Sequence, residues 1–221
     1  MRALLFALLL LAFVARPAAA ADATVPHPHQ GILTSYPGAP DLPALSAEDL
    51  EALGKGETVR KQVEVSTGGR GIAVQDVAAT PEIVWSRIVE YSKYPEWVDG
   101  VDACEVYGRS GEHINAYFQI SAMGVSVEYY IDHVYRPADG YMTWTLDYSR
   151  ESDLDDSVGF WRVMPHPEKP GGTRVYYSVD VRLRGWVPGF IQSMITKKGL
   201  IQATEWVKRE SEEVAAGGSS P

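Results

Sequence analysis

The sequence predicts an α+β protein with a curved antiparallel sheet of six or seven strands, two short helices inserted after an early strand, and one long C-terminal helix. Three observations support this class. Strand-like segments are separated by short turns, which favours antiparallel neighbours. One amphipathic helical pattern interrupts them early, and a longer one follows them. The 221 residues are enough for one domain with an ordinary core.

Residues 1–20 are typical of a secretory signal peptide. Arg2 supplies a positive charge, an apolar run of about 13 residues follows, and small residues after Pro17 predict cleavage near Ala20. A membrane anchor is the alternative, but the apolar run is short for a membrane-spanning helix. We therefore expect an exported protein, periplasmic or secreted, that is soluble after cleavage.

The composition of the expected mature chain is acidic. Without Arg2 and Arg16, 18 basic residues stand against 29 acidic ones, a net charge of −11. This charge argues against nucleic acid as a partner and against tight adsorption on anionic membranes, and it leaves transient membrane contact open. Cys104 is the one cysteine, which excludes an intrachain disulfide. Its strand-like surroundings predict a buried thiol.

Residues 21–56 are expected to form an N-terminal leader with a short helix. The part at 21–45 is rich in Pro, Gly and Ala without periodicity, which predicts an extended and mobile segment. His27 and His29 could contact a metal ion. No cysteine or carboxylate lies near them in the sequence, so a solvated tail is the expectation and no metal site is predicted.

A short helix and a hairpin follow the leader. Ser46 is a predicted N-cap, with Asp49 in the capping-box position, and Gly54 and Gly56 end the helix. Two strand-like runs flank the turn "STGGRG", which predicts a β-hairpin.

The segment "ATPEIVWSRIVEYSKYPEW", residues 79–97, predicts a helix followed by an aromatic turn. Thr80 is the expected N-cap and Pro81 the first helical residue. Helical spacing predicts one buried stripe, made of Val84, Trp85, Ile88 and Tyr91.

Six further strands complete the expected sheet. They are predicted at 101–107, 113–123, 125–135, 141–150, 157–164 and 173–184. A long amphipathic helix with Pro188 in its first turn follows them. The folded domain is expected to span 57–214, with a disordered tail at 215–221.

The period of two in strands assigns their side chains to faces. In 125–135, the set with Tyr129, Ile131 and His133 faces inward, because the alternate set carries two charges. The same rule gives the remaining inward residues: Ala116, Phe118, Ile120 and Ala122; Met142, Trp144, Leu146, Tyr148 and Arg150; Val175, Tyr177, Val179, Val181 and Leu183. The strand at 157–164 is ambiguous, and Gly159, Trp161 and Val163 are favoured as its inward residues. One helix covers only part of such a face, so either an apolar pocket or a fully packed core results, and periodicity alone does not distinguish them.

The candidate cavity residues are mostly aromatic. They are Trp97, Phe118, Tyr129, His133, Trp144, Tyr148, Arg150, Trp161, Tyr177, Ile191, Met194 and Ile195. His133 is a weak candidate for a catalytic base, and a half-buried histidine bonded to a tyrosine is the alternative. The acidic run at 151–156 lacks the spacing of a calcium loop and is expected to be solvated. No cofactor is expected.

The order of these motifs resembles the START-like helix-grip (SRPBCC) superfamily, which includes polyketide cyclase/dehydrase and coenzyme-Q-binding proteins. The resemblance covers about 60–214 and depends on Thr-Pro-Glu-x-x-Trp, Tyr-Pro-x-Trp, and Val-Pro before the last helix. It implies a sheet wrapped around the terminal helix, an apolar cavity between them, and an aromatic turn from Tyr94 to Trp97 at one end. None of these motifs is a catalytic signature.

Three functions remain as hypotheses. The first is binding and carriage of an apolar small molecule, such as a lipid, quinone or polyketide-like compound, by an exported protein. The second is a cyclase or dehydrase acting in the same cavity. The third is an interaction module without a ligand. The absence of Ser-His-Asp or metal-ligand spacing argues against a hydrolase or a metalloenzyme.

Overall fold

The computed structural model describes residues 21–65, 68–122, 125–184 and 199–217. Its strands form one antiparallel sheet in the order β1-β2-β8-β7-β6-β5-β4-β3. The strands are β1 (Val59–Val65), β2 (Gly68–Val77), β3 (Val101–Ser110), β4 (His113–Ala122), β5 (Val125–Arg136), β6 (Tyr141–Leu146), β7 (Leu154–Pro165) and β8 (Thr173–Leu183). The sheet thus has eight strands rather than six or seven, because the early hairpin joins it through β2 and β8.

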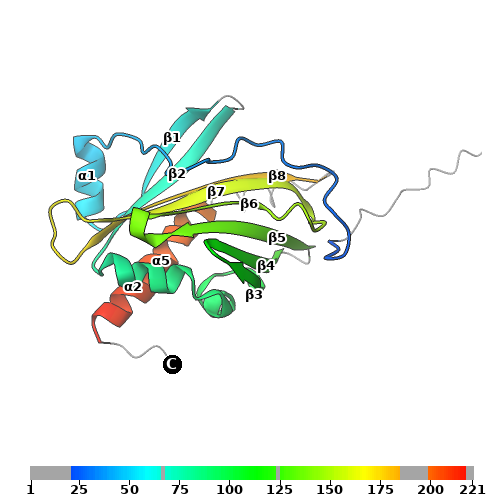
Figure 1. Cartoon of the computed structure of the whole chain (residues 1–221). Helices are drawn as coiled ribbons and strands as arrows, with labels where there is room; N and C mark the ends of the chain where they lie inside the picture. Colours follow the sequence, from blue (N-terminus) through cyan, green and yellow to red (C-terminus); the bar gives the residue numbers. More distant parts are fainter. Residues whose placement is uncertain (1–20, 66–67, 123–124, 185–198, 218–221) are drawn as a thin grey trace, which may run out of the picture.

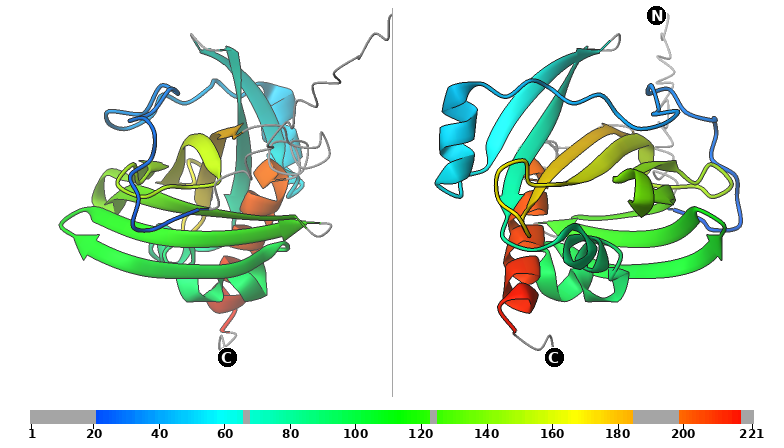
Figure 2. Two further views of the ribbon diagram at one scale, coloured as in Figure 1. Left: turned by 90° about the vertical axis from the view of Figure 1, so that its right-hand side faces the viewer. Right: turned by 60° about the vertical axis from the view of Figure 1, so that its left-hand side comes forward.

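The described part of the chain contains four α-helices and two short 3-10 turns around the sheet. They are α1 (Ala47–Gly54), α2 (Pro81–Ile88), α3 (Tyr94–Trp97) and α5 (Gly199–Ala215), with short 3-10 turns η1 (Tyr91–Lys93) and η2 (Pro137–Asp139). The sheet is curved, and α5 lies on its concave side with α2 beside it (Figures 1 and 2). This is the predicted α+β helix-grip arrangement. Among the described helices, none combines the length and apolarity needed to cross a bilayer.

The inner face of the sheet forms the main core, as the strand alternation predicted. Ile131, Met142 and Leu146 are buried in it, and Trp161 and Val163 of the ambiguous β7 also face inward. On β8, Val175 is buried while Tyr177 packs at the edge of the cluster. Cys104 is a buried free thiol, so that prediction is confirmed, and burial raises its pKa.

The helix α2 and the turn η1 that follows it bury the predicted stripe. Val84, Trp85, Ile88 and Tyr91 are all at most 5% exposed. Pro81 begins the helix, and Thr80 is its N-cap residue, although the Thr80 side chain makes no capping hydrogen bond. The capping box of α1, in contrast, is complete: Ser46 and Asp49 each accept a bond from the other's backbone N–H.

The outer face of the sheet carries a second core that the sequence did not predict. Tyr36 packs edge-on against Phe160, with ring centroids 5.0 Å apart. Leu53 of α1, 1% exposed, packs in the same cluster as Val74 and Tyr176. The leader and α1 therefore cover the outer side of β1, β2, β7 and β8. Figure 1 shows the blue leader passing the ends of the central strands before running back to α1.

The leader is anchored by the acidic run that was expected to be solvated. Asp156, 0% exposed, accepts hydrogen bonds from the backbone N–H groups of Ile32 and Leu33, both at 2.7 Å. Asp22 and Glu151 exchange two backbone bonds, and the Glu151 carboxylate pairs with Arg184 at 2.5 Å. The expectations of a solvated leader and a solvated acidic loop were both wrong. The two segments are far apart in sequence, and each satisfies the polar groups of the other.

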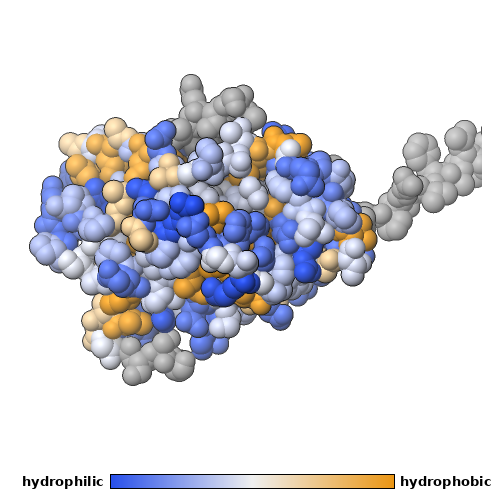
Figure 3. Space-filling model, viewed as in Figure 1, coloured by the Kyte–Doolittle hydropathy of each residue, from blue (hydrophilic) through white to orange (hydrophobic). Residues whose placement is uncertain are grey.

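Large apolar side chains that remain exposed are scattered over separate elements. Examples are Ile32 in the leader, Leu50 in α1 and Val106 in β3. On the face drawn in Figure 3, hydrophobic surface is broken up by hydrophilic residues. Single exposed apolar residues are normal for a globular protein, so this face does not indicate an apolar docking site.

Candidate functional site

A cavity of about 210 Å³ lies between the concave face of the sheet, the turn after α3, and α5. Its wall is mainly aromatic and aliphatic. A cavity of about 150 Å³ is sufficient to hold benzene in another protein. This space therefore accommodates at least one ring or a short alkyl segment.

Six of the candidate residues meet at this cavity. They are Phe118, Tyr129, His133, Trp144, Trp161 and Tyr177. These side chains come from the five neighbouring strands β4 to β8, because residues two apart on a strand share a face and antiparallel pairing aligns those faces. Their rings contact one another: Phe118 stacks on Tyr129 at 5.2 Å, and Trp161 lies 4.3 Å from Tyr177 between centroids.

Trp97 lies beside the cavity rather than in its wall. Its ring stacks on that of Trp206 from α5, with centroids 5.8 Å apart and planes 23° apart. Trp206 itself lines the cavity, together with Tyr94 from the same aromatic turn as Trp97. The turn therefore closes one end of the space, at the place that the family resemblance implied.

Tyr148 and Arg150 do not line the cavity. Strand β6 ends at Leu146, so its alternation does not extend to them. The Tyr148 hydroxyl donates to Asp156 at 2.8 Å, and the Arg150 guanidinium lies 4.1 Å from the ring centroid of Tyr107. The prediction that these two side chains line the cavity is therefore wrong. Ile191, Met194 and Ile195 lie outside the described residues.

Several lining residues were not among the candidate cavity residues of the sequence. Tyr94, Leu154 and Trp206 belong to the wall. Trp206 had a usable signal, since Ala203 stands three residues before it, which puts both on one helical face. Leu154 had none, because it opens a strand inside an acidic run.

His133 brings a polar atom to the cavity wall. Its Nδ1 lies 3.2 Å from the carbonyl oxygen of Ile114, its partner on β4. A carbonyl only accepts, so Nδ1 carries the proton and Nε2 is left as an acceptor. Burial lowers the pKa of His133 to about 4, and the bond to Ile114 offsets only part of that effect. The imidazole is therefore neutral at neutral pH.

Tyr129 and Tyr177 add two hydroxyl groups to the wall. Neither hydroxyl has a hydrogen-bond partner within the described ranges, and burial raises the pKa of both. Enclosed polar groups are normally paired, with protein or with a bound molecule. Ser157 and Gln202 lie on the same wall. The cavity thus combines a large apolar surface with a few polar groups, which is the usual composition of a small-molecule site.

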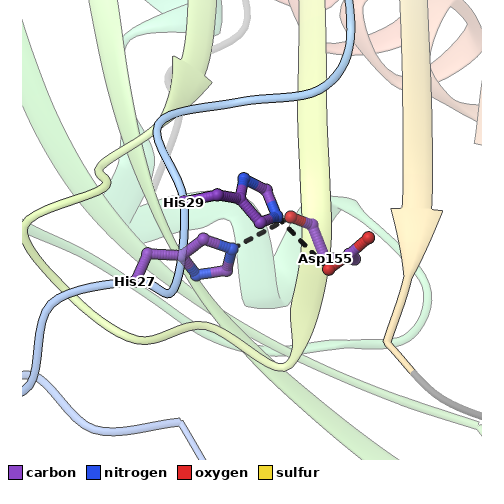
Figure 4. A group of neighbouring side chains, drawn as sticks. All are labelled: His27, His29 and Asp155. Atoms are coloured by element: carbon purple, nitrogen blue, oxygen red, sulfur yellow. Dashed lines mark hydrogen bonds and ion pairs between the residues drawn. The ribbon is translucent and has the colours of Figure 1, made fainter.

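A second cluster joins His27, His29 and Asp155 at the leader (Figure 4). His27 is 4% exposed, and its Nε2 bonds the carbonyl oxygen of Asp155 at 2.9 Å. His29 Nδ1 accepts the N–H of Gly31 at 3.1 Å, which puts the proton on Nε2, 3.3 Å from the Asp155 carboxylate. A metal ion would need that Nε2 lone pair. These hydrogen bonds therefore indicate that the cluster anchors the leader rather than binding a metal ion.

A third cluster, at the far end of the sheet, is a buried ion group. Arg174 binds both carboxylate oxygens of Asp76, at 2.7 and 2.9 Å, and His166 Nε2 lies 2.8 Å from the same carboxylate. Burial alone would raise the pKa of Asp76, but the bonds from Arg174 and His166 outweigh it and lower that pKa. Two backbone N–H groups occupy His166 Nδ1. This cluster joins β2 to β8 and to the β7–β8 turn, and its hydrogen bonds indicate a structural role.

Comparisons with known proteins agree with this architecture. Residues 60–213 match the family model described as polyketide cyclase / dehydrase and lipid transport. The search of curated proteins found no match. Among solved structures, an aromatase/cyclase from Streptomyces sp. R1128 is similar at 15% identity and TM-score 0.57, covering 73% of this chain and all of the other.

Two further solved structures share the fold. A START superfamily protein from Mycobacterium smegmatis is 18% identical, with TM-score 0.52, covering 71% of this chain and 98% of the other. A STAR-related lipid transfer protein from Xanthomonas axonopodis is 15% identical, with TM-score 0.54, covering 70% and 92%. The family match extends over more than half of the sequence and over the whole sheet apart from Val59. This chain belongs to the polyketide cyclase / dehydrase and lipid transport family.

Proposed function

We propose that the protein binds and carries an apolar small molecule that bears at least one hydroxyl group, and that it does so after export. The observation that carries this proposal is the cavity of about 210 Å³, walled by aromatic rings, with the neutral imidazole of His133 among its lining residues. A guest hydroxyl would donate to Nε2 of His133. The hydroxyls of Tyr129 and Tyr177, which have no hydrogen-bond partner in the described part of the chain, would pair with further oxygens of the guest.

The energetics suit reversible carriage. Each buried methylene gains about 0.8 kcal/mol, and a guest that fills this space gains several times that before the cost of association is subtracted. Micromolar affinity is the expected outcome. The net charge of −11 in the expected mature chain supports only transient contact with membranes, from which such a guest would be collected.

A cyclase or dehydrase in the same cavity is the second candidate, and His133 argues against it. A general base works best with a pKa near the working pH. The pKa of His133 is lowered to about 4 by burial, which makes its nitrogen a weak base at neutral pH. A ligand-free interaction module is disfavoured by the cavity itself, because such a protein gains nothing from leaving aromatic rings unpacked.

Extraction of the purified protein tests the proposal. The full chain is expressed in a bacterial host with export, purified without detergent, extracted with organic solvent, and the extract is analysed by mass spectrometry. The variant Val179→Phe fills the cavity from β8, where Val179 lines the wall. The matched control is Val106→Phe at an exposed position of β3.

The proposal expects one apolar hydroxylated compound, in near-stoichiometric amount, from the wild type and the control but not from Val179→Phe. The variant His133→Ala then separates carriage from catalysis. If extracts are empty, or if Val179→Phe retains the compound in full, the proposed carrier function is wrong.

A further inference from the structure

The first residue of the expected mature chain lies against a carboxylate. The backbone nitrogen of Ala21 is 3.1 Å from Oδ1 of Asp153. The other oxygen of this carboxylate, Oδ2, accepts the N–H of Glu128 on β5 at 2.8 Å. One oxygen of Asp153 is thus bound to the sheet, and the other is directed at the nitrogen that signal peptidase would release.

The position of Ala21 is fixed by its neighbour. Asp22 exchanges two backbone hydrogen bonds with Glu151, at 2.9 and 3.0 Å. Oδ1 of the Asp22 carboxylate accepts the N–H and the hydroxyl of Thr24, at 2.8 and 2.7 Å. The carboxylate that bonds the nitrogen of Ala21 is that of Asp153 and not that of the neighbouring Asp22.

The charge around this nitrogen is negative. The Asp153 carboxylate bonds it, Asp22 is the next residue in the chain, and within the described residues Arg184 pairs with Glu151 rather than with Asp153. A peptide nitrogen offers one neutral N–H to Asp153. A free α-amino group, with an ordinary pKa of about 7.7 to 8.0, offers a positive charge and three donors at neutral pH. Bonds between an ammonium and a carboxylate are the stronger kind.

We propose that the chain is processed between Ala20 and Ala21, and that the new α-ammonium group of Ala21 forms an ion pair with Asp153 that completes the anchoring of the leader. Removal of residues 1–20 would then be a step of folding as well as of export. The proposal depends on the expected signal peptide and is independent of what the cavity binds.

Identification of the amino terminus is the first test. The full chain is expressed in an exporting bacterial host, and the mature protein is subjected to N-terminal sequencing. The expected sequence is Ala-Asp-Ala-Thr-Val. Any other first residue overturns the proposal.

A thermodynamic cycle tests the ion pair. Four proteins are compared: the chain beginning at Ala21 and the same chain with Gly-Ser added in front, each with Asp153 or with Asp153→Asn. With Asp153, the extension should lower the melting temperature by about 1–3 °C, as expected for a partly exposed ion pair in a chain of this size. With Asp153→Asn, the extension should have less than half that effect.

The control for the cycle is Asp102→Asn, an exposed substitution on β3 that should leave the effect of the extension unchanged. If the extension shifts the melting temperature equally with Asp153 and with Asn at this position, the α-amino group has no special bond with Asp153 and the proposal is wrong.

Discussion

The indole ring of Trp144 on β6 lies directly over Gly159 on β7, its cross-strand partner. A Cβ added at Gly159 would overlap Cζ2 of Trp144 on one side and the carbonyl oxygen of Ser178 on the other. The glycine is thus required by the space that the indole occupies, and Trp144 in turn forms part of the cavity wall.

Gly159→Ala should therefore change both stability and the cavity. The added methyl group must displace Trp144 toward the cavity, at a cost of about 1–3 kcal/mol for overpacking. Urea unfolding followed by circular dichroism measures that loss, and the extracted amount of guest should fall. Gly38→Ala is the matched control, because a Cβ at Gly38 meets no atom within 4 Å. Equal stability of the two variants would contradict the close contact.

His133 should make the fold sensitive to acid. Burial lowers its pKa to about 4 in the folded state, against about 6.5 when unfolded, so the unfolded chain binds more protons between these values. The free energy of unfolding should therefore fall as the pH decreases from about 6.5 to 4, by at most about 3 kcal/mol from this residue.

The measurement is a series of urea melts between pH 7 and pH 4. His133→Gln should have a shallower loss of stability over this window than the wild type. His113→Gln serves as the control, since the His113 side chain is 51% exposed. If His133→Gln and the wild type lose stability in parallel, His133 is not the buried neutral group described here.

The leader should depend on Asp156. Asp156→Asn keeps the shape of the side chain but replaces an acceptor oxygen with an NH₂ donor, which leaves backbone N–H groups of Ile32 and Leu33 without a full set of acceptors. Loss of one buried partner costs about 1–3 kcal/mol. Limited proteolysis should cut the variant faster within residues 21–45. Asp139→Asn, at an exposed site in η2, should be cut at the wild-type rate.

Gly31 offers a second test of the same segment. Its φ of +104° is strained for any residue with a side chain, and a Cβ there would meet the Tyr148 hydroxyl at 2.6 Å. Gly31→Ala should loosen the leader without touching the cavity wall. Faster proteolysis with unchanged guest content is the expected pair of results. Normal resistance to protease would mean that this turn is not needed to dock the leader.

The buried ion group should contribute strongly to stability. Arg174→Met removes both bonds to Asp76 and leaves a buried carboxylate that keeps only the hydrogen bond from His166 among these partners. Breaking a buried pair in this way costs about 3–5 kcal/mol. The double variant Arg174→Met with Asp76→Leu should recover part of the loss, because it removes the uncompensated charge. Recovery is measured by urea midpoint, and its absence would contradict the ionic origin of the effect.

Much of the fold could be predicted because its signals are local. The alternation in β5 and β8 identified their inner faces, and the helical spacing of Val84, Trp85 and Ile88 identified the buried side of α2. Periodicity alone could not predict that the early hairpin pairs with the rest of the sheet, so the number of strands in the sheet could not be derived from it. The assignment of Tyr148 and Arg150 to the inner face was wrong, because nothing in the alternation marks the end of β6 at Leu146.

The leader could not be predicted, for a physical reason. His27 and Asp156 look like solvated residues in isolation, since each is polar and lies in a sequence without periodicity. Their partners are more than 100 residues away along the chain, and only the folded sheet brings them together. The second core against Phe160 was missed in the same way, because its cover comes from an irregular segment.

Titration of the mature protein with 2-naphthol and with naphthalene, followed by tryptophan fluorescence, tests the central claim most directly. Trp144, Trp161 and Trp206 line the cavity and report on its occupancy. The account predicts micromolar binding of 2-naphthol, roughly tenfold weaker binding of naphthalene, and loss of both in Val179→Phe. A wild type that binds neither compound, or a Val179→Phe protein that binds both as well as the wild type, would contradict it.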